Sequence, residues 1–197
     1  CICLAVTVFF VAFCALTHAG EDRAVTTTYG EFPVTFWWPP PPENTDWEGY
    51  KLIGDAGFTL ILGGNRVAYK QVNEKVFEYT QALNISVIVR DDRIYELPAY
   101  EAGNIPPELE KLIDEVVQDY KDYPNLMGFM LADEPSAGKF VTLGAASELL
   151  LERLPDTVPY VNLLPTIPGP ERFGTATYEE YVDLFVRTVK PKILSFD

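Results

Sequence analysis

The chain has 197 residues and a formal net charge of −14, with 48% hydrophobic and 22% charged residues. This composition is that of a globular protein and excludes an intrinsically disordered chain. An acidic surface of this size repels phosphate backbones, so we expect no nucleic-acid partner.

The first 19 residues have the pattern of a secretory signal peptide. Residues 2–16 carry no charge, and the small-x-small segment at 17–19 precedes the charged residues 21–23. This run is shorter than the about 20 residues of a membrane-spanning helix, although a membrane anchor is the alternative. We therefore expect secretion, a linker over residues 20–31 and no membrane contact after cleavage. Because the chain begins with Cys1 rather than Met, we expect its natural start to lie further upstream.

Cleavage would remove all residues with thiol or imidazole chemistry, which are Cys1, Cys3, Cys14 and His18. The mature protein would then have no disulfide, no nucleophile of the serine–histidine or cysteine–histidine type, and no zinc site with His or Cys ligands. Carboxylates, Tyr, Lys, Arg, Ser and Thr would remain for proton transfer. We therefore expect neither a cofactor nor a metal.

From Pro33 onward, short apolar segments typical of buried strands alternate with longer segments of helical periodicity. The predicted strands are residues 33–38, 58–62, 85–89, 126–132, 158–163 and 192–196. The predicted helices are residues 46–57, 74–83, 108–120, 140–154 and 178–189. Asp46 is expected to cap the first of these helices, and Pro106-Pro107 to open the third.

Strands that are apolar on both faces indicate a parallel sheet covered by helices, either as a (β/α)₈ barrel or as an open doubly wound sheet. The open sheet usually has a glycine-rich phosphate turn after its first strand. Here the prolines at 39–42 follow that strand and offer no N–H donors. We therefore predict an α/β protein with the TIM (β/α)₈-barrel fold over residues 32–197. A complete barrel needs about 250 residues, so we expect the chain to stop after the sixth strand.

Functional residues of such barrels stand at the carboxyl ends of the strands. In this chain these positions are polar or aromatic, and they are Trp37, Trp38, Asn65, Arg90, Asp91, Asp92, Asp133, Glu134, Asn162 and Asp197. Loop residues are commonly polar for solvation alone, so the pattern by itself defines candidates only.

The most distinctive of these positions is the pair Asp133-Glu134, which follows the uncharged segment 126–132 and precedes Pro135. Neighbouring side chains along a strand point to opposite faces, so only one carboxylate can enter the barrel mouth directly. A carboxyl group at such a rim suits general acid/base catalysis. The alternative is that the pair caps the following helix.

The run from Gly128 to Ser136 resembles the strand-four motif of retaining glycoside hydrolases of the large (β/α)₈ clan. The later strands resemble a branch of secreted barrel hydrolases with a D-E-P motif. The resemblance implies that Glu134 is the acid/base, and that the nucleophile ends a seventh strand beyond residue 197. Asp133 stands where the clan usually has an Asn that contacts the sugar. Because glycoside cleavage needs two carboxylates, we expect the 197-residue chain alone to be inactive.

Further residues are candidates for substrate binding beside Asp133, and they are Trp37, Trp38, Arg90, Asn162 and Asp197. The two tryptophans suit stacking on sugar rings, with core packing as the alternative. The arginine could hold a substrate hydroxyl, although an ion pair with Asp92 or Glu134 is the preferred role. The asparagine could donate to a sugar hydroxyl.

These features predict a secreted glycoside hydrolase, of the retaining type, that acts on an oligo- or polysaccharide. One alternative is a carbohydrate-binding barrel without turnover, or an inactive fragment. Another is an ester or phosphate hydrolase whose metal is held by carboxylates alone, with Asp91, Asp92, Asp133 and Glu134 as ligands. The sequence carries no signal for an oligomeric state.

Overall fold

The computed structural model of the protein describes residues 33–37, 39–63 and 70–196. The predicted signal peptide and linker lie outside the described residues, as do Trp38, Asn65 and Asp197. Within the described part of the chain, no helix is long and apolar enough to span a membrane.

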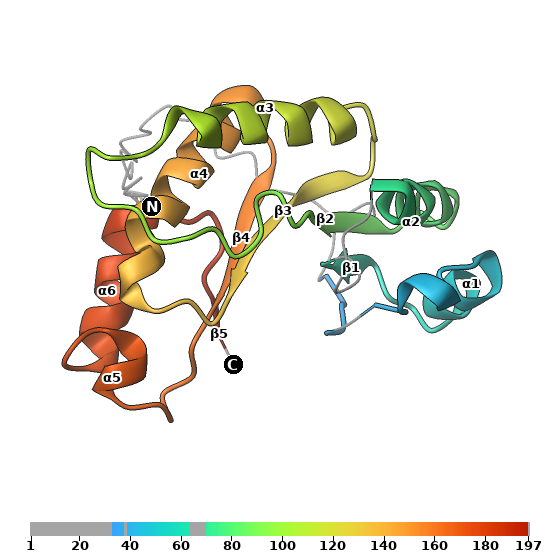
Figure 1. Cartoon of the computed structure of the whole chain (residues 1–197). Coiled ribbons are helices and arrows are strands. Elements are labelled where there is room, and N and C mark those ends of the chain that lie inside the picture. Colours follow the sequence, from blue (N-terminus) through green and yellow to red (C-terminus); the bar gives the residue numbers. More distant parts are fainter. Residues whose placement is uncertain (1–32, 38, 64–69, 197) are drawn as a thin grey trace, which may run out of the picture.

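The described residues form strands that alternate with helices along the chain (Figure 1). The strands are β1 (Leu60–Leu62), β2 (Ser86–Arg90), β3 (Leu126–Asp133), β4 (Val158–Leu163) and β5 (Ser195–Phe196). The α-helices are α1 (Trp47–Asp55), α2 (Lys70–Ala82), α3 (Pro107–Tyr120), α4 (Phe140–Arg153), α5 (Pro170–Phe173) and α6 (Tyr178–Val189). Two short 3₁₀ helices are η1 (Pro42–Asn44) and η2 (Ala137–Lys139).

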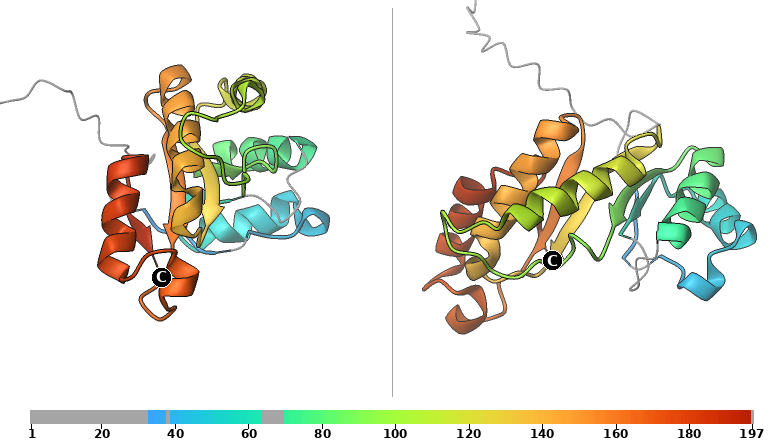
Figure 2. Two further views of the ribbon diagram at one scale, coloured as in Figure 1. Left: turned by 60° about the vertical axis from the view of Figure 1, so that its left-hand side comes forward. Right: turned by 45° about the horizontal axis from the view of Figure 1, so that its top comes forward.

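The strands form one sheet in the order β1-β2-β3-β4-β5, with every neighbouring pair parallel. The main core lies between one face of this sheet and helices α1, α2, α3, α4 and α6. A second apolar cluster on the opposite face contains strand residues and Tyr95 but no helix residue. The helices follow one another around the covered face from α1 to α6 (Figures 1 and 2).

This arrangement distinguishes the two predicted architectures. A doubly wound sheet has helices on both faces and a strand order that reverses at a switch point, whereas the described strands run in sequential order with helices on one face. The described residues therefore have an α/β fold of five parallel strands curled into part of a TIM-type barrel. The apolar cluster of the second face is the barrel interior, which side chains of the strands fill.

Local signals place two helix ends as predicted, and a capping box that was not predicted sets the start of α6. The side chain of Asp46 accepts a hydrogen bond of 2.8 Å from the backbone N–H of Gly49 at the start of α1. Pro106 precedes α3, and Pro107 is its first residue, where the missing N–H would have no partner. Thr177 and Glu180 form a reciprocal capping box at the start of α6.

The predicted first strand, residues 33–38, is wrong for the part that the structure describes. Residues 33–37 form no strand. Their backbone meets the edge of β1 at Val34, whose carbonyl oxygen accepts hydrogen bonds from Thr59 and Leu60 at 3.0 and 3.2 Å. Because both bonds converge on one carbonyl, and the flanking prolines have no N–H donors, no ladder extends along the segment.

Two further predictions are corrected at the other end of the chain. The segment 192–196 pairs as a strand only over Ser195–Phe196. The proline-rich loop after β4 contains the short helix α5, which Pro170 opens and Gly174 ends with a φ of 76°. Glycine suits this left-handed position because it has no Cβ.

Candidate functional site

The carboxyl ends of β2, β3 and β4 bring three of the predicted residues to one edge of the sheet. Asp133 is the register partner of Asn162, and Arg90 pairs with Met130 in the neighbouring ladder. Asn162 lies on the same face of β4 as Val158 and Tyr160, which belong to the interior cluster. The Asp133 and Asn162 side chains therefore face the inside of the curled sheet, at its mouth.

The two adjacent carboxylates contact different elements, and Glu134 lies just beyond the end of β3, where strand alternation no longer applies. Asp133 Oδ1 accepts a hydrogen bond of 3.2 Å from Asn162 Nδ2. Glu134 has a φ of 47°, and its N–H donates to the carbonyl oxygen of Asn162 at 2.8 Å. Its side chain is 34% exposed, and Oε2 lies 3.8 Å from Nη2 of Arg172. Glu134 is thus half-buried at the strand end within reach of Arg172 on α5, whereas Asp133 bonds to Asn162 on β4.

The alternative that this pair caps a helix is wrong. The residue before η2 is Ser136, and the residue before α4 is Lys139. Neither helix receives a side-chain capping bond. The partners of the two carboxylates are instead Asn162 for Asp133 and Arg172 for Glu134.

A chain of hydrogen bonds runs along the strand ends behind Asp133. Ser195 Oγ donates to Asn162 Oδ1 at 2.8 Å, and the hydroxyls of Tyr160 and Ser195 are 2.7 Å apart. Since Ser195 has one proton and gives it to Asn162, Tyr160 must donate to Ser195. The Asn162 amide thus accepts from Ser195 through Oδ1 and donates to the Asp133 carboxylate through Nδ2.

Arg90 lies beside the same mouth and forms the predicted ion pair with Asp92. Its Nε and Nη2 atoms are 3.3 and 3.2 Å from Asp92 Oδ1. The guanidinium also stacks on Tyr95, with Cζ 3.9 Å from the ring centroid. Arg90, Tyr95, Trp37 and Met130 line a cavity of about 10 Å³, which is the size of one water molecule. Trp37 is exposed, so the alternative that it is a core aromatic is wrong.

Asp91 points the other way, into a network between the sheet and the helices. It is 2% exposed, and its carboxylate accepts hydrogen bonds from Arg93 Nε and Nη2 at 2.9 and 2.8 Å and from the Tyr120 hydroxyl at 2.8 Å. Burial by itself raises the pKa of Asp91, but the hydrogen bonds from Arg93 and Tyr120 outweigh it and hold the pKa below its usual value.

The opposite directions of Asp91 and Asp133 bear on the alternative of a hydrolase whose metal is held by carboxylates. Asp91 faces the helices, whereas Asp133 faces the interior. Among residues 33–37, 39–63 and 70–196, no three side chains of the His, Cys, Asp or Glu type converge as metal ligands. The described residues thus form no site of the kind that this alternative proposed.

Four residues at the mouth carried no signal in the sequence. They are Glu96, Lys139, Arg172 and Ser195, and each lies outside the strand ends that the apolar pattern marks. Only Ser195 lies in a segment that was predicted to be a strand. Arg172 lies on α5, whose first residue is Pro170. Proline is common at the first position of a helix, so this proline could have indicated the helix that carries Arg172.

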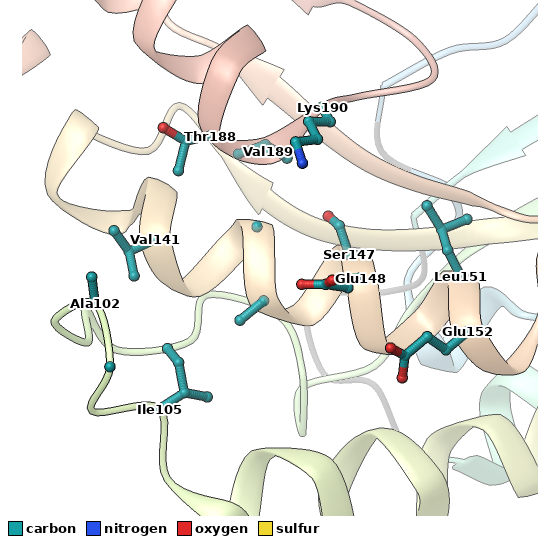
Figure 3. Close-up of a pocket in the computed structure, with 13 residues that line it drawn as sticks. Ala102, Ile105, Val141, Ser147, Glu148, Leu151, Glu152, Thr188, Val189 and Lys190 are labelled. Carbon is teal, nitrogen blue, oxygen red and sulfur yellow. The ribbon is translucent and has the colours of Figure 1, made fainter.

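A wide groove lies elsewhere on the described residues, along the outer side of α4 (Figure 3). It has a volume of about 660 Å³ and is bounded by the loop before α3 and the end of α6. Ser147 lines it, is 4% exposed, and has a hydroxyl without a hydrogen-bond partner. None of the predicted site residues lines this groove.

No known protein family and no curated protein matches the chain in sequence. Solved structures match its fold. A protein assigned as an α-L-fucosidase from Bacteroides thetaiotaomicron has a TM-score of 0.55 and 12% identity, over 89% of this chain and 67% of its own. A β-1,4-D-mannanase from Cryptopygus antarcticus has a TM-score of 0.53 and 10% identity, over 79% and 60%.

A further match is an FMN-binding β-glucuronidase from Faecalibacterium prausnitzii, with a TM-score of 0.50 and 13% identity, over 80% of this chain and 27% of its own. The chain thus spans only part of each of these structures. At such identities the likeness concerns the fold: the neighbours are glycosidases with TIM-type barrels, and the described residues share a part of that architecture.

Proposed function

We propose that the chain is part of a secreted retaining glycoside hydrolase whose general acid/base is Glu134. The observation that carries this proposal is the position of the Asp133-Glu134 pair at the carboxyl end of β3, at the mouth of the curled sheet. In barrels of this type the catalytic groups occupy that edge. The glycosidases that share the fold support the same reading. Secretion rests on the predicted signal peptide, residues 1–19.

In this proposal Glu134 donates a proton to the glycosidic oxygen as the bond to the anomeric carbon breaks, while a second carboxylate attacks that carbon. Glu134 then removes a proton from the water that releases the sugar. In this proposal the second carboxylate would end a seventh strand, which the described residues do not include. Asp133 and Arg90, which lie at the same mouth as Glu134, would bind sugar hydroxyls.

Trp37 would supply the apolar contact of the substrate site. It is exposed beside Arg90 and Tyr95, at the same end of the sheet. A tryptophan face covers the apolar face of a sugar ring and loses little entropy on binding. The substrate class that fits this combination of carboxylates, a guanidinium and an aromatic face is an oligo- or polysaccharide.

The test uses the complete gene product and the Glu134→Gln variant with two aryl glycosides, one with a good and one with a poor leaving group. Loss of a general acid costs about 10²-fold to 10⁴-fold in rate, and the cost should be larger for the poor leaving group because that oxygen needs the proton. Glu171→Gln is the matched control, since this exposed carboxylate lies next to Arg172 on α5. Equal rates for wild type and Glu134→Gln on both substrates would remove Glu134 from the mechanism.

A carbohydrate-binding barrel without turnover is the second candidate. The observation that favours it is Asp133, which stands in the place of the clan's Asn and already accepts the amide of Asn162. Calorimetry with oligosaccharides separates the two functions. Binding by a wild-type protein that cleaves none of the bound sugars would support the second candidate.

A further inference from the structure

Glu96 connects the loop after β2 to the end of β3, next to the proposed catalytic pair. Its backbone N–H donates to the carbonyl oxygen of Leu131 at 2.8 Å, and its Oε1 accepts from the N–H of Asp133 at 3.0 Å. Its second carboxylate oxygen pairs with Lys139 Nζ. One residue thus bonds to β3 twice and to η2 once.

These bonds continue the sheet past the point where its ladder ends. The last paired residues of β2 and β3 are Arg90 and Met130. Beyond them, Glu96 supplies the donor for Leu131 and the acceptor for Asp133 that a neighbouring strand would otherwise provide. On the other side of β3, the register with β4 shifts between Met130 and Ala132. Glu96 therefore fixes β3 where its pairing is irregular.

The turn that Glu96 supports has an unfavourable backbone conformation. Glu134 has a φ of 47°, and Glu96 itself has a φ of 55°. A residue with a Cβ rarely adopts this left-handed region and keeps it only where surrounding bonds impose it. Asn162 imposes it from β4 by accepting the Glu134 N–H, and Glu96 does so from the β2 side through the N–H of Asp133.

Lys139 completes the arrangement from the far side of the turn. It is the last residue of η2, which directly follows Ser136. Because its ammonium pairs with Glu96 Oε2, the Glu96 carboxylate is bonded on both sides of the Asp133-Glu134-Pro135 turn. We propose that Glu96 is a positioning residue, whose carboxylate bridges the Asp133 N–H and the Lys139 ammonium and thereby fixes the direction of the Glu134 side chain. Its effect on catalysis rests on the proposed function.

The kinetic test compares Glu96→Ala and Glu96→Gln in the complete gene product, with aryl glycosides as substrates. The alanine variant should lose about 10-fold to 100-fold in kcat, with KM little changed, because a displaced catalytic group lowers the rate without removing substrate contacts. The glutamine variant keeps an acceptor for the Asp133 N–H and should recover most of the rate. Glu101→Ala is the matched control, since Glu101 is an exposed residue of the same loop.

A double variant separates positioning from general damage. If Glu96 acts through Glu134, Glu96→Ala should cost nothing further in the Glu134→Gln background, because the group that it positions is already gone. An equal loss in both backgrounds would overturn the positioning role, as would full activity of the alanine variant. A folded state is checked by thermal denaturation of each variant.

A structural measurement tests the inference even if the proposed function fails. Wild-type protein without turnover on any glycoside would refute the glycosidase proposal but not the contact. A crystal structure of Glu96→Ala should then show Glu134 outside the left-handed region and displaced from Arg172. If Glu134 keeps its φ near 47° and its distance from Arg172 in that structure, Glu96 does not position it.

Discussion

Replacement of Asp91 by Asn should destabilise the protein because it removes the charge at the centre of a buried network. Both oxygens of Asp91 accept hydrogen bonds, from Arg93 on one side and from Arg93 and Tyr120 on the other. An amide in the same place has one acceptor oxygen, and its NH₂ group would face donors. The Arg93 guanidinium would also lose its closest buried counter-charge.

The expected cost follows from how much of the network survives. Removing one partner of a buried ion pair costs about 3–5 kcal/mol. Arg93 is 31% exposed and keeps Asp119, whose Oδ2 is 2.8 Å from Nη2. Water and this second carboxylate offset part of the loss, so we expect a decrease of about 2–3 kcal/mol in the free energy of unfolding. Urea denaturation measures it as a lower midpoint with an unchanged slope.

The lowered pKa of Asp91 predicts how the stability difference between wild type and Asp91→Asn changes with pH. The pKa of Asp91 is lowered in the folded protein, whereas an unfolded Asp has a pKa of about 3.9. The stabilisation is therefore fully present above the unfolded pKa and is lost as the pH falls through the folded pKa. The difference between wild type and Asp91→Asn should be constant near neutral pH and shrink below about pH 4.

Asp92→Asn is the control for this measurement. Its carboxylate is 47% exposed and pairs with Arg90 at 3.2 Å, so its removal should cost about 0–1 kcal/mol. A loss in Asp91→Asn as small as that of the control would refute the assignment of Asp91 to a stabilising network. So would a stability difference that stays constant in acid.

Three further substitutions test packing and helix capping in the rest of the fold. Ser147→Ala should raise the unfolding free energy by about 1 kcal/mol, because it removes a buried hydroxyl without a partner; a lower melting temperature would contradict this. Gly128→Ala should cost about 3 kcal/mol or more, since a Cβ there would lie 2.0 Å from the carbonyl oxygen of Val158, and an unchanged urea midpoint would show that the strands separate easily. Thr177→Ala should cost about 1 kcal/mol through loss of the capping box of α6, whereas Thr177→Ser should retain most of it in the same thermal denaturation.

The regular elements of the fold could be predicted because local physics specifies them. The segment 126–132 is apolar without interruption, and it forms β3. Asp46 and Pro106-Pro107 act through backbone groups within a few residues, so their signals survive in the sequence. The segment 33–38 shows the limit of this reasoning, since strand-like composition does not supply a ladder partner.

The direction of each carboxylate could be predicted only in part. Strand alternation does not set the direction of Glu134, because β3 ends at Asp133 and Glu134 has a φ of 47°. The apolar pattern also does not say which face Asp133 takes. The register between β3 and β4 decides this, because it pairs Asp133 with Asn162. The partners Glu96 and Arg172 lie 38 residues away on each side of Glu134 in the sequence, and no short-range pattern connects them.

The sequence by itself therefore determined the alternation of strands and helices, the parallel sheet, and the strand end at which the carboxylate pair lies. These follow from the periodicity of apolar residues and from backbone capping, which act over a few residues. Only the tertiary structure decided that the helices cover one face and that Asp91 belongs to a buried network. It also decided that Glu96 and Asn162 hold the Asp133-Glu134 turn from opposite sides. Such contacts depend on strand register and on loops with left-handed residues, and both are set when distant segments pack together.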